Sequence, residues 1–230
     1  IEIDAVLVCP IADAHAACIR KALHTGRHVL VEKPFVTRLI DGVELAQEAG
    51  QRDLTIGVIQ NWRAKSVGQN LKHAIASGKL GRIGNIFFQY VRNREHAWLP
   101  EYLFEESFPL LYAMGIHHLD LFRYILGENI KYVSGQGFTP AWSNYKSSPG
   151  VILSMQSESG VAISYAGTFS SQNLNHPQEN LLIDGERGTL ANESDWGDPP
   201  LIFSSAESNS TDDLIVDSDG NDIRSQYDRA

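Results

Sequence analysis

The sequence predicts an α/β protein in two parts. Residues 1–60 predict part of a doubly wound parallel sheet, and residues 61–230 predict an α/β domain with an open, mostly antiparallel sheet. Strand-like and helix-like segments alternate over the first part, as in βαβ units. Short apolar runs separated by Gly, Asn and Ser dominate the second part, as in hairpins. With 230 residues, 43% of them hydrophobic and 20% charged, the chain can bury a sizeable core.

The first part contains three apolar runs with two amphipathic segments between them. A helix is predicted over 14–25 with Gly26 as its C-cap, and another over 37–49, with Thr37 as N-cap and Gly50 ending it. Right-handed crossovers bring the carboxyl ends of the strands to one edge, where open α/β sheets bind ligands. Short runs rich in Val, Leu and Ile predict buried parallel strands at 6–9, 28–31 and 54–59.

In the second part, strands outnumber helices. One helix is expected around Val67, Leu71 and Ile75, ending at Gly78, and a second over 109–126. Ser159-Gly160 and Asp184-Gly185 are turn signals that indicate antiparallel hairpins. Strands are predicted at 83–91, 132–137, 151–157, 161–169, 181–184 and 189–191.

Charge, hydropathy and cysteine content exclude several classes of protein. The 28 acidic and 19 basic residues give a net charge of −9, which argues against a nucleic-acid partner. No apolar run approaches the ~20 residues that span a bilayer, and no signal-peptide pattern is present. We therefore predict a cytoplasmic protein without a membrane partner. Cys9 and Cys18 form no disulfide framework, which fits a reducing compartment.

The two ends of the chain give further expectations. Residue 1 already lies inside a strand-like run, so we expect an internal piece of a longer protein. The acidic stretch at 217–222 departs from a calcium loop at two ligand positions. We predict a hairpin turn there and no metal site in the protein.

Two places carry residues suited to chemistry. Lys33 follows the strand at 28–31, so its ammonium is expected at the ligand-binding edge of the sheet. His117 and His118 lie inside the helix at 109–126, and a buried imidazole with a pKa near ~6.5 can move protons at neutral pH. Taken alone, Lys33 also fits a solvated loop and His117 a satisfied core histidine.

Four motifs follow one another in order: ALHTGRHVLVEKP at 22–34 preceded by His15, NWR at 61–63 preceded by Gly57, GKLGRI at 78–83, and GIHHLD at 115–120 followed by RYILG at 123–127. With these motifs, residues 4 to about 191 closely resemble the glucose-fructose oxidoreductase, inositol dehydrogenase and MocA-like family (Gfo/Idh/MocA).

The resemblance implies an N-terminal Rossmann domain that binds NAD or NADP and a C-terminal domain whose open sheet forms the substrate wall. It implies that Lys33 lies beside the nicotinamide and the reacting hydroxyl, and that His117 is the acid/base. Oxidising an alcohol removes a hydride from carbon and a proton from oxygen, for which an ammonium and an imidazole are suitable. The implied cofactor contacts are Cys9, Pro10, His15, Glu32, Lys33 and Arg63, and the implied substrate contacts are Lys33, Asn61, His117 and His118.

Three departures from the family pattern stand out. Many members have an Asp four residues before the catalytic His, where this sequence has Ala113. The usual Thr-Pro before His15 reads Pro10-Ile11, so the turn near the nicotinamide is expected to differ. The Gly-rich phosphate loop and the acidic ribose-reading residue are expected upstream of residue 1, so we expect this chain alone to be inactive and to bind cofactor poorly.

The leading hypothesis is therefore an NAD(P)-dependent oxidoreductase that acts on a sugar, polyol or related cyclic alcohol. Ala113 favours an alternative, a non-catalytic regulator that senses ligand and cofactor. A redox-neutral NAD-dependent glycosidase is a third possibility. Open sheets in this position also imply a homo-oligomer formed through the C-terminal sheet. Substrate identity, the choice between NAD and NADP, and oligomer size are left open by the sequence.

Overall fold

The computed structural model divides into two compact units, Ile1–Asn61 and Trp62–Ala230, which are described one at a time. It describes residues 3–95, 102–172, 179–194, 201–206 and 211–214. The hairpin turn predicted at 217–222 lies outside these ranges. Within them, no helix is long and apolar enough to cross a membrane.

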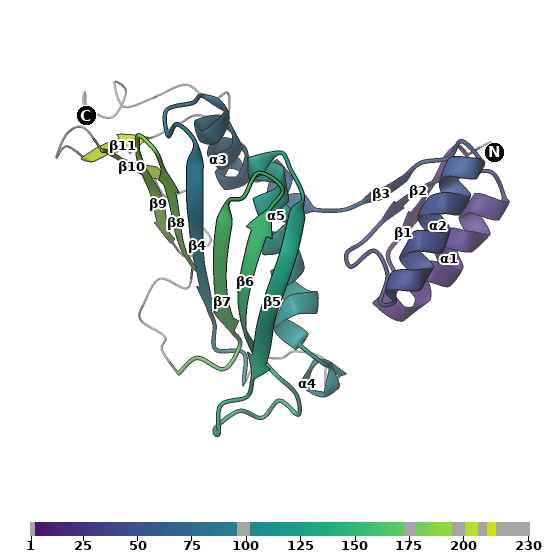
Figure 1. Ribbon diagram of the computed structural model, residues 1–230. Helices are drawn as coiled ribbons and strands as arrows, with labels where there is room; N and C mark the ends of the chain where they lie inside the picture. Colours follow the sequence, from purple (N-terminus) through teal and green to yellow (C-terminus); the bar gives the residue numbers. More distant parts are fainter. Residues whose placement is uncertain (1–2, 96–101, 173–178, 195–200, 207–210, 215–230) are drawn as a thin grey trace, which may run out of the picture. The chain divides into compact units, whose positions relative to one another are not determined.

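The first unit is a three-stranded parallel sheet with helices on one face (Figure 1). Both neighbouring strand pairs run parallel, which confirms the predicted βαβ arrangement. A short 3-10 turn, η1 (Ala12–Ala14), precedes the first helix. The elements are β1 (Ala5–Val8), α1 (His15–His24), β2 (His28–Val31), α2 (Leu39–Gln51) and β3 (Ile56–Val58).

The core of this unit lies on the helix-covered face of the sheet. Alternate strand residues point to opposite faces, so Val8, Val29 and Val31 are buried whereas Leu7 and Leu30 are 61% and 45% exposed. The buried strand residues pack against apolar side chains of both helices: Ile19, Ala22, Leu23, Leu45 and Ala49.

Both predicted ends of α2 were wrong. The helix begins after Arg38, without a side-chain cap, and it continues through Gly50 to Gln51. Thr37 is therefore not the N-cap. The chain instead turns at Asp53, which has a φ of 54° and so takes the left-handed conformation expected of the glycine.

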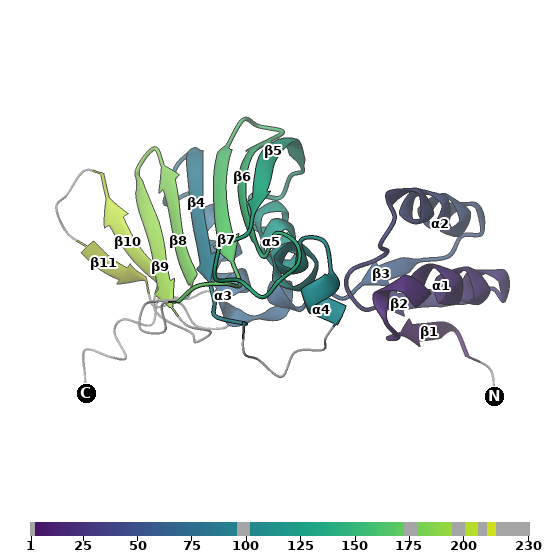
Figure 2. The same cartoon turned by 90° about the horizontal axis from the view of Figure 1, so that it is seen from below.

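The second unit is an eight-stranded sheet with α3 and α5 packed against one face. Figure 2 shows the strands side by side in the order β11-β10-β9-β8-β4-β7-β6-β5. Its central pair, β4 and β7, is parallel and the other pairs are antiparallel, so the predicted mostly antiparallel open sheet is confirmed. The strands are β4 (Ile83–Val91), β5 (Ile130–Phe138), β6 (Gly150–Ser157), β7 (Ala162–Thr168), β8 (Glu179–Gly185), β9 (Gly188–Ser194), β10 (Leu201–Ser205) and β11 (Thr211–Leu214).

Two features of this sheet differ from the sequence-based prediction. The strands β10 and β11 were not predicted, because 201–205 and 211–214 lack a clear alternation of apolar and polar residues. The turn between β8 and β9 is formed by Glu186 and Arg187, one residue after the Asp184-Gly185 signal, because Gly185 and Gly188 still pair.

The helices of the second unit cover its core. The remaining elements are η2 (Asn61–Ala64), which starts at the unit boundary, α3 (Ser66–Ala76), α4 (Tyr102–Glu105), η3 (Leu111–Gly115) and α5 (Ile116–Leu126). The predicted helix at 109–126 is present and ends at Gly127 with a φ of 72°. Its segment η3 is a π-helix, however, which the sequence pattern did not indicate.

Alternate residues of the central strands separate the core from an open face. Ile86, Phe88 and Tyr90 of β4 are buried under α3 and α5. Phe87, on the opposite face of the same strand, is 47% exposed, and Ile152 of β6 is 48% exposed. One face of the sheet is therefore core and the other carries exposed apolar side chains.

Candidate functional site

The loops that follow β1 and β2 leave the parallel sheet at its carboxyl edge. Cys9 and Pro10 follow β1 and are exposed, whereas Glu32 and Lys33 follow β2 and are half-buried. The Glu32 amide donates to the carbonyl oxygen of Val8 at 2.9 Å, so strand pairing extends into these loops. The first unit thus brings four of the implied cofactor residues to one sheet edge. Both cysteines, Cys9 and Cys18, are free thiols.

Lys33 is the half-buried cation of this edge. Burial lowers the pKa of its amine, and the negative charge of Glu32 opposes that shift. The main-chain amide of Lys33 donates to Glu32 Oε2 at 3.1 Å, which fixes the direction of the Glu32 side chain. A lysine whose pKa is lowered can stabilise an oxyanion while charged and releases its proton more readily than a solvated lysine.

His15 lies beneath the same two loops. It is the first residue of α1 and is 1% exposed. Its Nδ1 lies 2.8 Å from the carbonyl oxygen of Pro34, and its Nε2 lies 3.2 Å from the carbonyl oxygen of Pro10. The imidazole therefore spans the gap between the loop after β1 and the loop after β2.

In the second unit, His117 packs against the indole of Trp62. The imidazole is 6% exposed, which confirms the burial predicted for it. The two rings are stacked with their centroids 6.1 Å apart and their planes 13° apart. The Lys65 Nζ lies 4.6 Å from the centroid of the Trp62 ring, and burial lowers the pKa of that amine. The indole of Trp62 thus contacts both the imidazole of His117 and the ammonium of Lys65.

His118 is the fully buried member of the histidine pair. Its Nδ1 lies 3.0 Å from the hydroxyl oxygen of Tyr165, and among the described residues no hydrogen-bond partner reaches its Nε2. Burial, together with the nearby charges of His117 and Lys65, lowers its pKa to about 3. His118 is therefore a neutral imidazole at ordinary pH. The aromatic rings around it belong to Trp62, Phe88, Tyr90 and Tyr165.

Arg63, the residue after Trp62, forms a bidentate ion pair with Asp120. Arg63 donates from Nε to Asp120 Oδ2 at 2.7 Å and from Nη2 to Oδ1 at 2.6 Å. The bond to Asp120 raises the pKa of the guanidinium. Because Asp120 lies one turn after His117 on α5, the pair fixes η2, and with it Trp62, against the helix of the histidines. Asn61 is exposed at the start of η2.

Ala113 occupies the position where the family pattern has an Asp. It lies within the π-helical η3, and Gly115 closes that segment. A Cβ atom on Gly115 would lie 3.0 Å from Leu111 Cδ2 and 3.6 Å from the Tyr165 hydroxyl oxygen. The glycine thus allows Leu111 and Tyr165 to approach the helix closely. The side chain one turn before His117 carries no group that can accept or donate a proton.

Three residues of this region were not singled out from the sequence. Trp62 appeared only as part of a family motif, and Lys65 and Tyr165 had no signal because helical spacing does not connect them to His117. The described residues contain no group of three or more His, Cys, Asp or Glu arranged to hold a metal ion.

A buried carboxylate, Glu95, marks the far end of β4. It is 5% exposed and accepts hydrogen bonds from Ser143 Oγ and the Asn144 amide, both at 2.7 Å. The Ser170 hydroxyl is a third donor, and together these bonds lower the pKa of Glu95 despite its burial. The carboxylate ties the loop after β5 to the end of β7.

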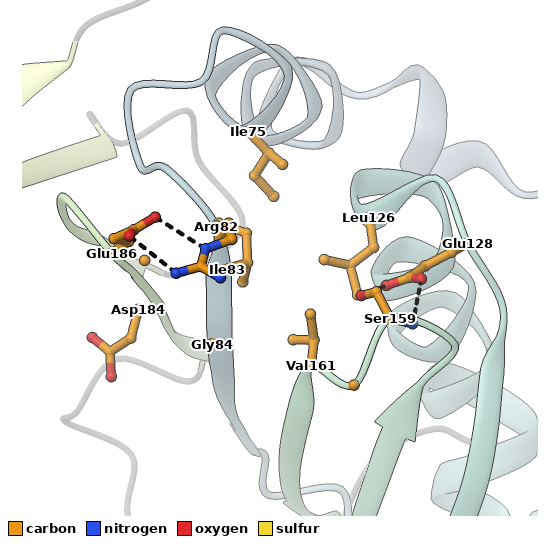
Figure 3. Close-up of a pocket in the computed structure, with 12 residues that line it drawn as sticks. Ile75, Arg82, Ile83, Gly84, Leu126, Glu128, Ser159, Val161, Asp184 and Glu186 are labelled. Carbon is orange, nitrogen blue, oxygen red and sulfur yellow. Dashed lines mark hydrogen bonds and ion pairs between the residues drawn. The ribbon is translucent and has the colours of Figure 1, made fainter.

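A cavity of about 700 Å³ opens at the C-terminal ends of α3 and α5. None of the residues predicted to form the site lines it. Figure 3 shows Glu128 directed at Ser159, whose amide and hydroxyl donate to it at 2.7 and 2.6 Å. On the other side, Arg82 donates to both carboxylate oxygens of Glu186. These two carboxylates therefore serve local hydrogen bonds and an ion pair.

Two protein-family descriptions match the chain. Residues 1–60 match "Oxidoreductase family, NAD-binding Rossmann fold", and residues 69–191 match "GFO/IDH/MocA C-terminal domain". The second match alone covers more than half of the chain.

Individual proteins show the same similarity. The uncharacterized oxidoreductase YhhX of Escherichia coli (strain K12) is 34% identical over 55% of this chain and 36% of its own length. Myo-inositol 2-dehydrogenase of Thermotoga maritima is 28% identical over 59% of this chain and 40% of its own. An Agrobacterium radiobacter oxidoreductase solved with NAD+, L-tartaric acid and magnesium is similar with a TM-score of 0.81 and 20% identity, over 91% of this chain and 60% of that one. The alignments with YhhX and with the myo-inositol 2-dehydrogenase thus cover only 36% and 40% of the lengths of those two proteins.

Proposed function

The chain belongs to the Gfo/Idh/MocA oxidoreductase family, and from this premise we propose that the protein is an NAD(P)-dependent oxidoreductase. It transfers a hydride between the nicotinamide and a carbon that carries a hydroxyl group. The substrate class is a sugar, a polyol or a related cyclic alcohol. The myo-inositol 2-dehydrogenase among its relatives supports the substrate class, and the NAD+ bound by its structural neighbour supports the cofactor.

The first unit suits the nicotinamide end of such a cofactor. The exposed Cys9 and Pro10 and the half-buried Lys33 lie at the carboxyl edge of a parallel sheet, which is where open α/β sheets bind ligands. When bound, the nicotinamide supplies the hydride acceptor or donor. Cys9, Pro10, Glu32, Lys33 and Arg63 are the proposed contacts, and His15, which is 1% exposed, supports the two loops through the carbonyl oxygens of Pro10 and Pro34.

Lys33 and His117 handle charge and protons. The Lys33 ammonium stabilises the negative charge that develops on the substrate oxygen as its proton leaves. A ring nitrogen of His117 accepts that proton in oxidation and returns it in reduction. Asn61, which is exposed, completes the proposed substrate side, whereas His118 is 0% exposed and lies in the core beneath His117. The observation that carries the proposal is the position of Lys33, a half-buried cation on the loop after β2 at the carboxyl edge of the parallel sheet, where open α/β sheets bind ligands.

The test is turnover by the full-length gene product. NAD and NADP are each offered with a panel of sugars and polyols, and absorbance of the reduced nicotinamide is followed while bound cofactor is assayed in parallel. Reduction with any panel member supports the proposal and begins to identify the substrate. Tight cofactor binding with no reduction across the panel contradicts it.

Two variants test the assigned roles. His117→Ala should leave dinucleotide binding within a few fold and remove most turnover, because the proton acceptor is lost. Lys33→Ala should reduce both, because Lys33 contacts cofactor and substrate. His24→Ala and Lys21→Ala, at exposed positions of α1, are matched controls and should change neither. Retained turnover in His117→Ala would overturn the assignment of the acid/base.

Ala113 supports a second candidate, a regulator that binds cofactor and ligand without turnover. The family pattern places a carboxylate one turn before the histidine, and this chain has a methyl group there. If the panel gives binding without reduction, Ala113→Asp becomes the decisive variant. Turnover gained by that substitution would identify the missing carboxylate as the reason for inactivity.

A further part of the proposal is a homo-oligomer formed through the open face of the second unit's sheet. On that face, Phe87 of β4 and Leu182 of the neighbouring β8 are 47% and 36% exposed, and Ile152 of β6 is 48% exposed. A shallow hollow of about 420 Å³ runs beside Phe87 and Leu182. A second copy of the same face supplies a self-complementary apolar surface, as a two-fold interface requires.

Molar mass in solution tests the interface. Ile152→Arg and Leu182→Arg should shift the protein toward monomer in size-exclusion chromatography with light scattering, since each buries a charge in the contact. Leu39→Arg is the matched control, because Leu39 is 85% exposed on α2 and lies outside this face. An unchanged molar mass in both interface variants would exclude this face.

A further inference from the structure

The imidazole of His15 joins the loop after β1 to the loop after β2. The carbonyl oxygen of Pro34 lies 2.8 Å from Nδ1 and that of Pro10 lies 3.2 Å from Nε2. Both partners are main-chain carbonyls of prolines, which accept hydrogen bonds and cannot donate them. His15 is 1% exposed, so bulk water does not compete for its ring nitrogens.

In any hydrogen bond with either carbonyl, the imidazole of His15 must therefore be the donor. A neutral imidazole carries one N–H and donates to one of the two carbonyls, whereas the doubly protonated ring donates to both. A side chain without a donor would remove the hydrogen bond that the imidazole supplies to these carbonyl oxygens. The ring therefore controls how the two loops are held together.

The loop after β2 carries Lys33 directly before Pro34. On the strand side, the loop is fixed by the Glu32 amide, which donates to the carbonyl oxygen of Val8. On the far side of Lys33, its next hydrogen-bonded anchor is the Pro34 carbonyl at His15. Lys33 thus lies between two main-chain anchors, one supplied by the sheet and one supplied by His15.

We propose that His15 is a positioning residue for Lys33, holding the loop after β2 against the loop after β1 so that the lysine amine stays at the sheet edge. The proposal rests on the proposed function, in which Lys33 contacts cofactor and substrate. His15 acts through the main chain and does not itself touch the reacting atoms. The half-burial of Lys33, which lowers the pKa of its amine, is the property that this support maintains.

The test measures the amine of Lys33 directly in the 230-residue chain. The protein is acylated competitively over a range of pH, digested, and the midpoint of the labelling profile of Lys33 is read by mass spectrometry. Two variants are compared with the original chain: His15→Phe keeps a ring but no donor, and His15→Gln keeps one amide donor. His24→Ala is the matched control, since His24 is exposed on the same helix and pairs with Glu48.

In His15→Phe, the Lys33 loop should relax and expose the amine. The labelling midpoint should then rise toward the ordinary lysine value of 10.5, because the burial that lowers it is reduced. His15→Gln should give a smaller rise, and His24→Ala none. A midpoint unchanged in folded His15 variants would overturn the proposal. Circular dichroism checks folding, and if the Phe variant does not fold, the Gln variant decides.

This readout is independent of catalysis. Labelling requires neither cofactor nor turnover, so a shifted midpoint together with an inactive full-length protein would refute the proposed function and leave the positioning role standing. If the full-length enzyme is active but the labelling midpoint of Lys33 is unchanged in the His15 variants, the positioning role would be refuted and the proposed function would stand. A purely structural His15 would lower stability in both variants without moving the Lys33 midpoint in the variant that still folds.

Discussion

Lys33 stands on a loop of the first unit and is held by main-chain contacts, whereas His117 and His118 stand on a helix of the second unit and are held by aromatic side chains. The first arrangement leaves the titratable group half-buried, with the backbone anchored on either side. The second buries both imidazoles among rings and an ion pair.

The difference predicts at which of these residues a substitution should also lower the stability of the fold. The main-chain anchors on either side of Lys33 involve the Glu32 amide and the Pro34 carbonyl, so they remain when the Lys33 side chain is replaced. A side chain that is part of the core cannot be replaced without disturbing the fold, because its neighbours lose packing when it changes. Variants around His117 and His118 should therefore cost stability, and variants of Lys33 should not.

The largest effect is expected at Trp62. Trp62→Ala removes a 5% exposed indole that contacts both histidines and should lower the free energy of unfolding by about 3–5 kcal/mol. Urea denaturation followed by circular dichroism measures it. Trp142→Ala is the matched control: Trp142 is 58% exposed and donates one hydrogen bond to the Ser170 carbonyl oxygen, so about 1 kcal/mol is expected. Equal losses would contradict the role given to the core.

The pH dependence of stability should come next. The pKa of His118 is about 3 in the folded chain and near 6.5 when unfolded, so the unfolded chain binds the extra proton first. Its contribution to stability is present above about 6.5 and is lost as pH falls toward 3, on the order of a few kcal/mol. His118→Gln should flatten this part of the profile, whereas His73→Gln, at an exposed position of α3, should not. Parallel profiles for the original chain and His118→Gln would refute the assignment.

Two helix glycines should respond in opposite directions. A Cβ on Gly68 of α3 would lie 2.2 Å from the carbonyl oxygen of Trp62, so Gly68→Ala should cost about 3 kcal/mol by displacing the segment that carries the indole. Gly50 of α2 has no atom within 4 Å of that position. Gly50→Ala should therefore stabilise by about 0.5 kcal/mol through helix propensity. Thermal unfolding distinguishes them, and effects of the same sign would contradict the comparison.

The smallest effect is expected at Lys33. Lys33→Met removes an amine whose pKa is lowered by burial and should change stability at neutral pH by less than ~1 kcal/mol. Because the unfolded chain keeps its proton up to higher pH, the original chain should gain stability relative to the variant as pH rises toward 10.5. A loss as large as that of Trp62→Ala would show that Lys33 belongs to the core after all.

Strong local patterns in the sequence predicted most of the fold. Alternation of apolar runs and amphipathic segments identified the parallel sheet of the first unit, and glycine at the end of a periodic segment correctly marked the end of α5 at Gly127. Prediction was weaker where a local signal competed with tertiary contacts. Gly50 lies inside α2, which continues to Gln51, and the residue with positive φ after the helix is Asp53.

The candidate site likewise contains residues that the sequence predicted and residues that it did not. Lys33 and His117 were found from their positions after a strand and inside an apolar helix. Trp62 and Lys65 were not found, because Trp62 reaches His117 only where the Arg63–Asp120 pair holds η2 against α5, and Lys65 in turn contacts Trp62. The π-helical turn that contains Ala113 likewise left no trace in the apolar spacing.

The sequence by itself determined which residues are candidates for chemistry and where most strands and helices lie, because hydrophobic periodicity and turn residues act over a few positions. Tertiary structure alone decided which groups surround those residues, how deeply each is buried and so in which direction its pKa moves. The physical reason is that desolvation and hydrogen bonding depend on neighbours distant in the chain: Pro34 at His15, Tyr165 at His118 and Asp120 at Arg63 are separated by 19, 47 and 57 positions.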